Sequence, residues 1–218
     1  SVREVAVKNA KSNLVIENGD VALDTKKLLA ILSDMGATGK SEEIIKIPGL
    51  STRLLVFTGL GEYKTKYEDE VLRRAAGSAA RALAGNSNAT FSLPAKKASS
   101  LAAIGEGALL GSYIFNKFRV DSLVQSHQAL KNITVQSSLA EMADAKTAIK
   151  RAIIIGEYTA LVRDLINTPP SHLNPDSFCE DISEAVKKAG GASIGLKVSI
   201  LNEKQLKAKG FGGITAVG

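Results

Sequence analysis

Short apolar runs alternate with longer helical patterns through the first part of the chain. The runs are bounded by residues that favour turns, and the longer patterns repeat apolar positions every three or four residues. Such alternation is typical of an α/β domain. The predicted strands cover residues 14–16, 44–47, 53–57, 89–93 and 132–136, and the predicted helices cover residues 25–35, 67–84 and 98–115. Turns are predicted at residues 18–20, 48–49 and 85–86.

The pattern then changes to one long predicted helix over residues 143–167, roughly 35 Å in length at about 1.5 Å per residue. Two apolar stripes run along it: Ile154, Tyr158, Leu161 and Leu165, and beside them Ile155, Val162 and Ile166. Because the apolar arc is wide, we expect this helix to lie between two other parts of the protein. Thr168, Pro169 and Pro170 end it, since proline cannot continue the hydrogen-bond ladder. We interpret it as a linker between two domains.

Residues 171–218 predict the beginning of a second domain. Asn174 followed by Pro175 favours a helix start, because proline fits the first helical position. The predicted elements are a helix over 175–189, a strand over 196–201, a short helix over 203–209 and a strand over 214–217. A segment of this size does not form an independent core without disulfides or metal. The predicted organisation is therefore an N-terminal domain over 1–142, a linker helix over 143–170 and an incomplete second domain over 171–218.

Composition narrows the class of protein further. The chain is 44% hydrophobic and 23% charged, with no apolar stretch of the length that a membrane span needs. It opens on charged residues, and its one cysteine, Cys179, excludes an internal disulfide framework. These features predict a cytoplasmic protein with no membrane partner. The net charge of +6 comes from scattered lysines and arginines, which favours a solvated surface over a nucleic-acid interface.

One glycine pair stands where a phosphate-binding loop would be. Gly59-Leu60-Gly61 follows a predicted strand and precedes a predicted helix. The third glycine of a dinucleotide-binding loop would fall at position 64, which is Lys64. A structural turn is therefore favoured over nucleotide binding.

Other glycines have plainer interpretations. Gly105, Gly107 and Gly111 lie within a helical pattern and indicate close helix packing. Residues 210–213 contain three glycines between a predicted helix and a predicted strand, as a cap and turn would.

The remaining candidate residues form no catalytic constellation. Glu157 and Asp164 are seven residues apart on one helical face, and paired carboxylates can hold a metal or transfer protons. Arg151 and Arg163 are close in sequence, so ion pairs are favoured.

The sulfur and imidazole side chains add no site. Cys179 is predicted to be a small buried apolar residue, and His172 a loop residue. His127 and His172 are the only histidines and lie far apart, so no zinc site is expected within this chain.

Four segments resemble one known family in the same order along the chain. Residues 163–170 read Arg-Asp-Leu-Ile-Asn-Thr-Pro-Pro with Pro175 following, which resembles the linker helix and catalytic-domain start of the leucyl (cytosol) aminopeptidases. Residues 57–61 before an Arg- and Ala-rich helix, residues 106–113, and residues 201–218 are similar to further segments of that family. The resemblance covers nearly the whole chain and is weakest before Leu50.

The resemblance implies a fold and a function. It implies a three-layer N-terminal α/β domain similar to macro domains, a long linker helix and the start of a second α/β domain, the metallopeptidase domain. Six subunits assemble in that family. Two divalent metal ions, manganese or zinc, are held by carboxylates and a lysine, and they activate a water against a peptide substrate.

The family's metal-binding signature Asn-Thr-Asp-Ala-Glu-Gly-Arg does not occur in this sequence. No catalytic, cofactor-binding or metal-binding residue is therefore assigned here. We expect the ligands beyond Gly218 and expect this chain to be inactive alone. Two alternatives remain open: a non-enzymatic macro-like ligand-binding module, and an accessory domain that binds DNA.

Overall fold

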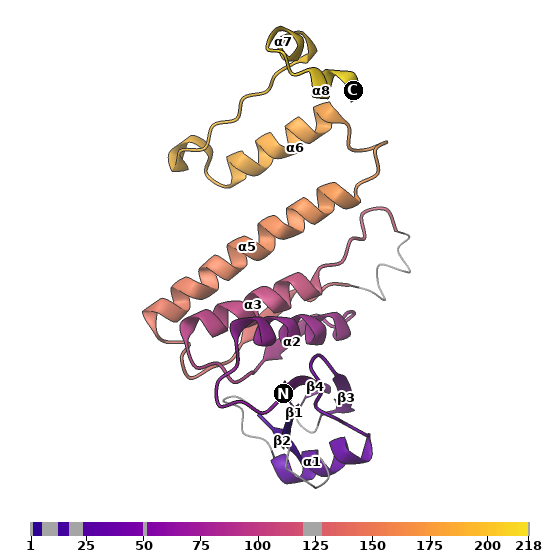
Figure 1. Ribbon diagram of the computed structural model, residues 1–218, viewed down its shortest axis with the longest axis vertical. Coiled ribbons are helices and arrows are strands. Elements are labelled where there is room, and N and C mark those ends of the chain that lie inside the picture. Colours follow the sequence, from indigo (N-terminus) through magenta and orange to yellow (C-terminus); the bar gives the residue numbers. More distant parts are fainter. Residues whose placement is uncertain (1, 6–12, 18–23, 50–51, 120–127, 218) are drawn as a thin grey trace. The chain divides into compact units, whose positions relative to one another are not determined.

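The computed structural model describes residues 2–5, 13–17, 24–49, 52–119 and 128–217. The chain divides into two compact units, Ser1–Arg163 and Asp164–Gly218. Among the described residues, the first unit holds the six strands and the helices α1, α2 and α3, together with most of α5 (Figure 1). The regular elements described in the second unit are helices, joined by irregular segments. The turn predicted over residues 18–20 and the histidine His127 lie outside the described residues.

A four-stranded mixed sheet forms the first layer of the first unit. Its strands are β1 (Val2–Val5), β2 (Asn13–Ile16), β3 (Ile44–Pro48) and β4 (Leu54–Glu62), in the order β2-β1-β4-β3. Strand β1 is antiparallel to β2 and parallel to β4, and β3 is antiparallel to β4. The predicted strands at residues 14–16, 44–47 and 53–57 are confirmed.

Helix α1 (Thr25–Asp34) packs one apolar face against this sheet. The Asp24 side chain caps it by accepting a 3.3 Å hydrogen bond from the Lys27 amide. The helix ends before Gly36, whose φ of 74° is a conformation that glycine adopts without a steric penalty. The buried residues of this small core are Ile16, Leu28, Leu32, Ile47 and Phe57.

Helices α2 (Asp69–Ala82) and α3 (Ala98–Ser112) lie side by side (Figure 1). Glycines allow their backbones to touch. A Cβ atom built on Gly107 would overlap the carbonyl oxygen of Arg73, and one built on Gly111 would overlap that of Gly77. The close packing predicted from the glycines of α3 is confirmed, because any larger residue at Gly107 or Gly111 would push the two helices apart.

A second, two-stranded sheet contributes to the core around α2 and α3, which is separate from the small core beneath α1. Strands β5 (Asn88–Phe91) and β6 (Asn132–Val135) are parallel, in a register that pairs Asn88 with Asn132. Five of the twelve buried residues in the core around α2 are alanines and two are aromatic, which matches the low aromatic content of 5%. Its buried residues are Leu60, Tyr67, Leu72, Ala75, Ala76, Ala79, Ala80, Phe91, Leu93, Ile104, Ala108 and Leu130.

Helix α5 (Ala143–Asn167) has the predicted bounds and packs one of its sides within the first unit. Its buried residues are the small ones, Ala145, Ala152 and Gly156. The opposite side carries the apolar stripes, and Ile154 and Val162 are 56% and 53% exposed. Small side chains of α5 pack closely on one side within the first unit. The expectation that this helix lies between two parts of the protein stays a prediction.

The second unit contains α6 (Pro175–Lys188), a 3₁₀ turn η1 (Gly191–Ile194), α7 (Glu203–Ala208) and α8 (Gly212–Val217). Helix α6 starts as predicted: the Asn174 side chain accepts from the Ser177 amide at 3.0 Å, and the Ser177 hydroxyl accepts from the Asn174 amide at 2.9 Å. This pair satisfies amides that the first helical turn leaves open.

The two strands predicted in the second unit are wrong. Residues 196–201 have no regular structure, and residues 214–217 lie in α8. The physical reason is that a strand exists only through hydrogen bonds to a neighbouring strand, and the described residues of this unit provide none. The apolar side chains of both segments remain exposed, among them Leu196, Val198, Ile200 and Ile214.

Candidate functional site

The glycine pair of the first unit lies inside strand β4, so the turn predicted there is wrong. Residues 39–43 run alongside the strand and bond to it. The Gly59 amide donates to the Glu43 carbonyl at 2.8 Å, and the Gly61 amide donates to the Gly39 carbonyl at 2.9 Å. These amides are therefore used within the protein and do not form a cradle for a phosphate. Gly59 is required for close approach, because a Cβ there would overlap the Lys40 carbonyl.

The turn beside β4 is organised by the Glu43 carboxylate. It accepts hydrogen bonds from the Thr38 amide at 2.9 Å, the Gly39 amide at 2.6 Å and the Thr38 hydroxyl at 3.1 Å. Successive amides of this kind can bind an anion. Here the anion is the protein's own carboxylate, so the turn is a structural unit.

The neighbouring Glu42 connects this turn to α2. Its φ of 63° is uncommon for a residue other than glycine. Its carboxylate forms an ion pair with Arg74 and accepts a 3.0 Å hydrogen bond from the Ser78 hydroxyl. These contacts offset the backbone strain and fix the turn to the helix.

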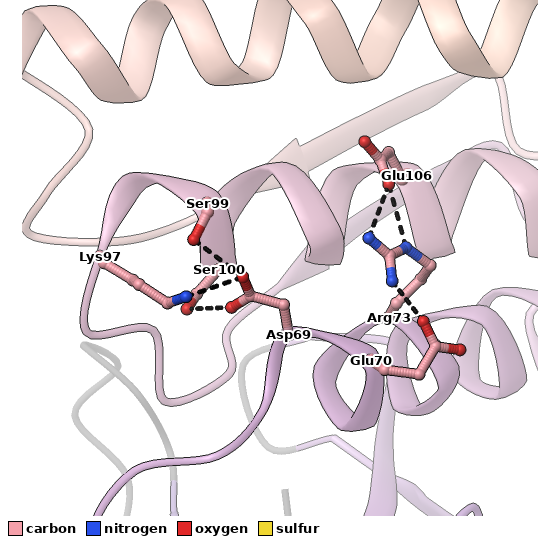
Figure 2. Close-up of polar contacts among 7 residues, drawn as sticks. All are labelled: Asp69, Glu70, Arg73, Lys97, Ser99, Ser100 and Glu106. Carbon is pink, nitrogen blue, oxygen red and sulfur yellow. Dashed lines mark hydrogen bonds and ion pairs between the residues drawn. The ribbon is translucent and has the colours of Figure 1, made fainter.

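A groove of about 670 Å³ lies in the first unit. Three helices contribute its polar lining: Asp69 and Arg73 from α2, Ser99 and Glu106 from α3, and Asp144, Thr147 and Arg151 from α5. Figure 2 shows the two charge clusters that α2 and α3 place along it.

The first cluster surrounds Asp69, which lies at the start of α2 and faces the start of α3 (Figure 2). Its carboxylate accepts hydrogen bonds from Lys97 Nζ at 2.9 Å and from the Ser99 and Ser100 hydroxyls at 2.8 Å each. Burial alone would raise the pKa of Asp69. The hydrogen bonds from Lys97, Ser100 and Ser99 and the charge of Lys97 outweigh burial and lower the pKa below its ordinary value.

The second cluster surrounds Arg73, one turn further along α2. Its Nε donates to Glu106 Oε2 at 3.0 Å, and its guanidinium also pairs with Glu70. Burial alone would lower the pKa of Arg73. The hydrogen bonds and charges of Glu70 and Glu106 outweigh burial and raise the pKa above its ordinary value. The arginine is permanently cationic, and it joins α2 to α3.

These clusters support packing rather than catalysis. The hydroxyls of Ser99 and Ser100 donate to a carboxylate that is held ionised, whereas a nucleophilic serine needs a base that accepts its proton. On the other wall, Arg151 has no ion-pair partner among the described residues. The groove contains no arrangement of nucleophile, base and oxyanion donors.

Arg163 of the family-like segment has a different role from the one predicted. Its guanidinium donates to the Leu110 carbonyl at 2.9 Å and lies 3.8 Å from the centre of the Tyr113 ring. It thereby ties α5 to the end of α3 through a hydrogen bond and a cation–π contact. The ion pair predicted between Glu157 and the nearby arginines is not formed among the described residues.

The described residues do not assemble a metal site. No group of three or more His, Cys, Asp or Glu side chains lies close enough to hold an ion in the part of the chain that the structure describes. His172 lies in the loop before α6, as predicted. Cys179 is half-exposed on α6 rather than buried, because α6 buries none of its residues completely. In the same described part, no helix is long and apolar enough to cross a membrane.

The long-range polar contacts of the first unit do not follow from the sequence pattern. Asp69 lies near the start of the helix predicted over residues 67–84, and Glu106 lies in the family-like segment over residues 106–113. The Glu70–Arg73 spacing of three residues was the one local signal available. The partners of Asp69 are about thirty positions away in sequence, and no local pattern predicts them.

The fold and these contacts define the class of protein. It has an α/β N-terminal domain that ends in a long helix, and this helix leads into the start of another domain. Comparison of the sequence with known protein families agrees with this domain organisation. Residues 6–122 match the N-terminal domain of the cytosol aminopeptidase family, and residues 160–218 match its catalytic domain. The chain belongs to the cytosol (leucyl) aminopeptidase family.

Curated relatives agree over nearly the whole chain. It is 39% identical to a probable cytosol aminopeptidase of Streptomyces avermitilis over 94% of its length, and 39% identical to one of Streptomyces griseus over 98%. It spans only 42% and 44% of those two proteins, respectively.

Solved structures share the fold. The bottromycin maturation enzyme BotP matches with a TM-score of 0.68 and 24% identity, over 92% of this chain and 41% of that one. A mutant tomato leucine aminopeptidase matches with a TM-score of 0.68 and 23% identity, over 83% and 36%. BotP has also been solved in complex with manganese.

Proposed function

We propose that this chain provides the N-terminal domain, the linker helix and the first elements of the catalytic domain of a metal-dependent leucyl aminopeptidase, which releases N-terminal amino acids from peptides. The observation that supports this most is the catalytic-domain match over residues 160–218. It begins within α5 and includes the Arg163–Pro170 segment. A cytoplasmic enzyme agrees with the names of its relatives, and the manganese complex of BotP supports manganese as the metal. Zinc as the alternative metal and a homo-oligomeric assembly are parts of the proposal that rest on the family resemblance alone.

The proposal assigns no catalytic step to residues of this chain. The described residues lack a donor set for two metal ions, and the sequence lacks the family signature Asn-Thr-Asp-Ala-Glu-Gly-Arg. The paired metals of such an enzyme activate the attacking water and stabilise the oxyanion. What this chain contributes is the linkage: Arg163 holds α5 against α3, and Asn174 starts the first helix of the second unit.

A matched pair of proteins tests the proposal. The first is this chain alone, and the second is a fusion that continues it with the remaining catalytic-domain sequence of the Streptomyces avermitilis relative. Hydrolysis of leucine anilide is measured with manganese, and folding is checked by circular dichroism. We expect turnover from the fusion, lost with a chelator, and none from the chain alone. Metal-dependent turnover by the chain alone, or a folded but inactive fusion, would contradict the proposal.

The two alternative functions gain no specific support. A nucleotide-type ligand of a macro-like module would need free amides near Gly59 and Gly61, but both amides bond to protein carbonyls. Calorimetry with ADP-ribose tests that alternative directly. A DNA-binding role would appear as salt-dependent binding.

A further inference from the structure

The groove between α2, α3 and α5 carries two charges that the fold itself does not use. Asp144 and Arg151 line it from α5, and both side chains are exposed. Neither has an ion-pair partner among the described residues. The Asp144 carboxylate accepts a 2.9 Å hydrogen bond from the Ala145 amide, which does not neutralise its charge. Since the two residues are two helical turns apart, they lie on the same side of α5.

Helices α3 and α5 run in the same direction along this groove. Gly105 of α3 faces Ala152 of α5, and further along both helices Leu109 packs against Gly156. The start of α3 therefore lies beside the start of α5, where Asp144 is. The middle of α3 lies beside the middle of α5.

The two ends of the groove consequently differ in charge. Asp69 lies at the Asp144 end, because its carboxylate bonds to the first turn of α3. Arg73 lies at the Arg151 end, because it bonds to Glu106 in the middle of α3. The two α2 charges are already paired with neighbouring side chains. The uncompensated charges are those of α5, which are negative at one end of the groove and positive at the other.

This polarity requires a ligand with an ammonium group at one end and a carboxylate at the other. A rise of 1.5 Å per residue separates the two α5 positions by about 10.5 Å along the helix. A single amino acid carries both charged groups on one Cα atom and is too short to reach both positions. An extended tripeptide spans up to about 10 Å, and the groove volume of about 670 Å³ is typical of small-ligand sites. Between the charges the lining is small and apolar, with Ala102, Ala103 and Ala148.

We propose that this groove binds short peptides with free termini, with the peptide ammonium at Asp144 and the peptide carboxylate at Arg151. A guanidinium group can donate two parallel hydrogen bonds to a carboxylate. Because both side chains are exposed, each ion pair is weak, and we expect a Kd on the order of 1 mM. The site goes beyond the proposed function and is tested on this chain alone, without hydrolysis. Failure of either proposal therefore leaves the other standing.

The test is a nuclear magnetic resonance titration of the ¹⁵N-labelled chain with tri-alanine, in the presence of a metal chelator. We expect saturable shifts of amides in the first halves of α3 and α5. N-acetylated tri-alanine and tri-alanine amide each lack one terminal charge, so each should bind about two- to fivefold more weakly. This comparison uses the original chain and does not depend on the folding of any variant.

Two variants assign each terminus to its partner. Arg151→Gln should bind tri-alanine about two- to fivefold more weakly and should no longer distinguish tri-alanine from its amide. Asp144→Asn should no longer distinguish tri-alanine from the N-acetylated peptide. Each variant should keep the discrimination that depends on the other residue, as a double-mutant cycle requires. A general loss of structure would weaken all three peptides alike.

Lys150→Gln is the matched control, because Lys150 is an exposed cation next to Arg151 that does not line the groove. It should leave the affinities for all three peptides unchanged. The proposal is overturned if tri-alanine shows no saturable binding up to about 20 mM, well above the expected Kd. It is also overturned if the shifts lie outside the groove, or if Arg151→Gln still prefers the free carboxylate.

Discussion

At the scale of single residues, the charges of the first unit hold helices together. Asp69 and Arg73 both start on α2, and both have partners on α3 or just before it. Ser100 is 2% exposed, so its hydroxyl depends on Asp69 for a hydrogen-bond partner. Groups of this kind contribute little net energy when paired but cost about 1–3 kcal/mol when a buried partner is left unsatisfied.

The lowered pKa of Asp69 predicts a pH dependence of stability. The carboxyl binds a proton less readily in the folded chain than in the unfolded one, so the unfolded state binds more protons as the pH falls. Its stabilising contribution is complete above the unfolded pKa of about 3.9 and is lost as the pH falls through the lower folded value. Urea unfolding of the original chain and of Asp69→Asn, from neutral pH to pH about 3, measures this. The variant should show a flatter dependence, and identical pH profiles would contradict the assignment.

At the scale of elements, the distance between α2 and α3 is set by glycine. The backbones touch at Gly107 and Gly111, while Gly105 of the same helix faces Ile149 with room for a methyl group. This contrast within one helix separates the effect of packing from the effect of helix propensity.

Gly107→Ala should destabilise the chain by about 1–3 kcal/mol or more, because the added methyl group overlaps the backbone of α2 and forces the helices apart. Gly105→Ala is the control. A Cβ there would lie 3.4 Å from the Ile149 side chain, and alanine favours the helix by up to about 1 kcal/mol. Chemical denaturation compares the two variants, and equal stability would show that the close approach is not real.

Helices were more predictable from the sequence than strands. The bounds of α5, and the start of α6 at Asn174, follow from apolar periodicity and capping residues, which are local signals. Strand β4 continues through Gly59 because residues 39–43 bond to it, and no local pattern contains that information. The strand predicted over 196–201 is wrong because no described residue of the second unit forms a neighbouring strand to which it could bond.

Only those features of the candidate site that depend on residues close together in the sequence could be predicted. Acidic residues such as Asp69 and Glu70 in a first helical turn are a local signal, and the packing role of the α3 glycines was predicted from the sequence. The contacts of Asp69 with Ser100 and of Arg73 with Glu106 join residues about thirty positions apart. They depend on how the helices pack, so only the structure reveals them.

At the scale of the whole molecule, the two units differ in how completely they bury apolar side chains. The first unit has two buried cores. In the second, α6 buries no residue completely, and Val198, Ile200 and Ile214 are 43%, 53% and 59% exposed. Together with the catalytic-domain match over residues 160–218, this predicts that the second unit gains its order from further catalytic-domain sequence.

Hydrogen exchange tests that claim most directly, on this chain alone and on the fusion with the remaining catalytic domain. In the chain alone, we expect the amides of residues 196–201 to exchange rapidly while those of α2 are protected, because unpaired backbone exchanges without unfolding. In the fusion, residues 196–201 should become protected to the level of α2 as they join a sheet. Slow exchange at 196–201 in a monomer of the chain alone, or rapid exchange there in an active fusion, would contradict the account.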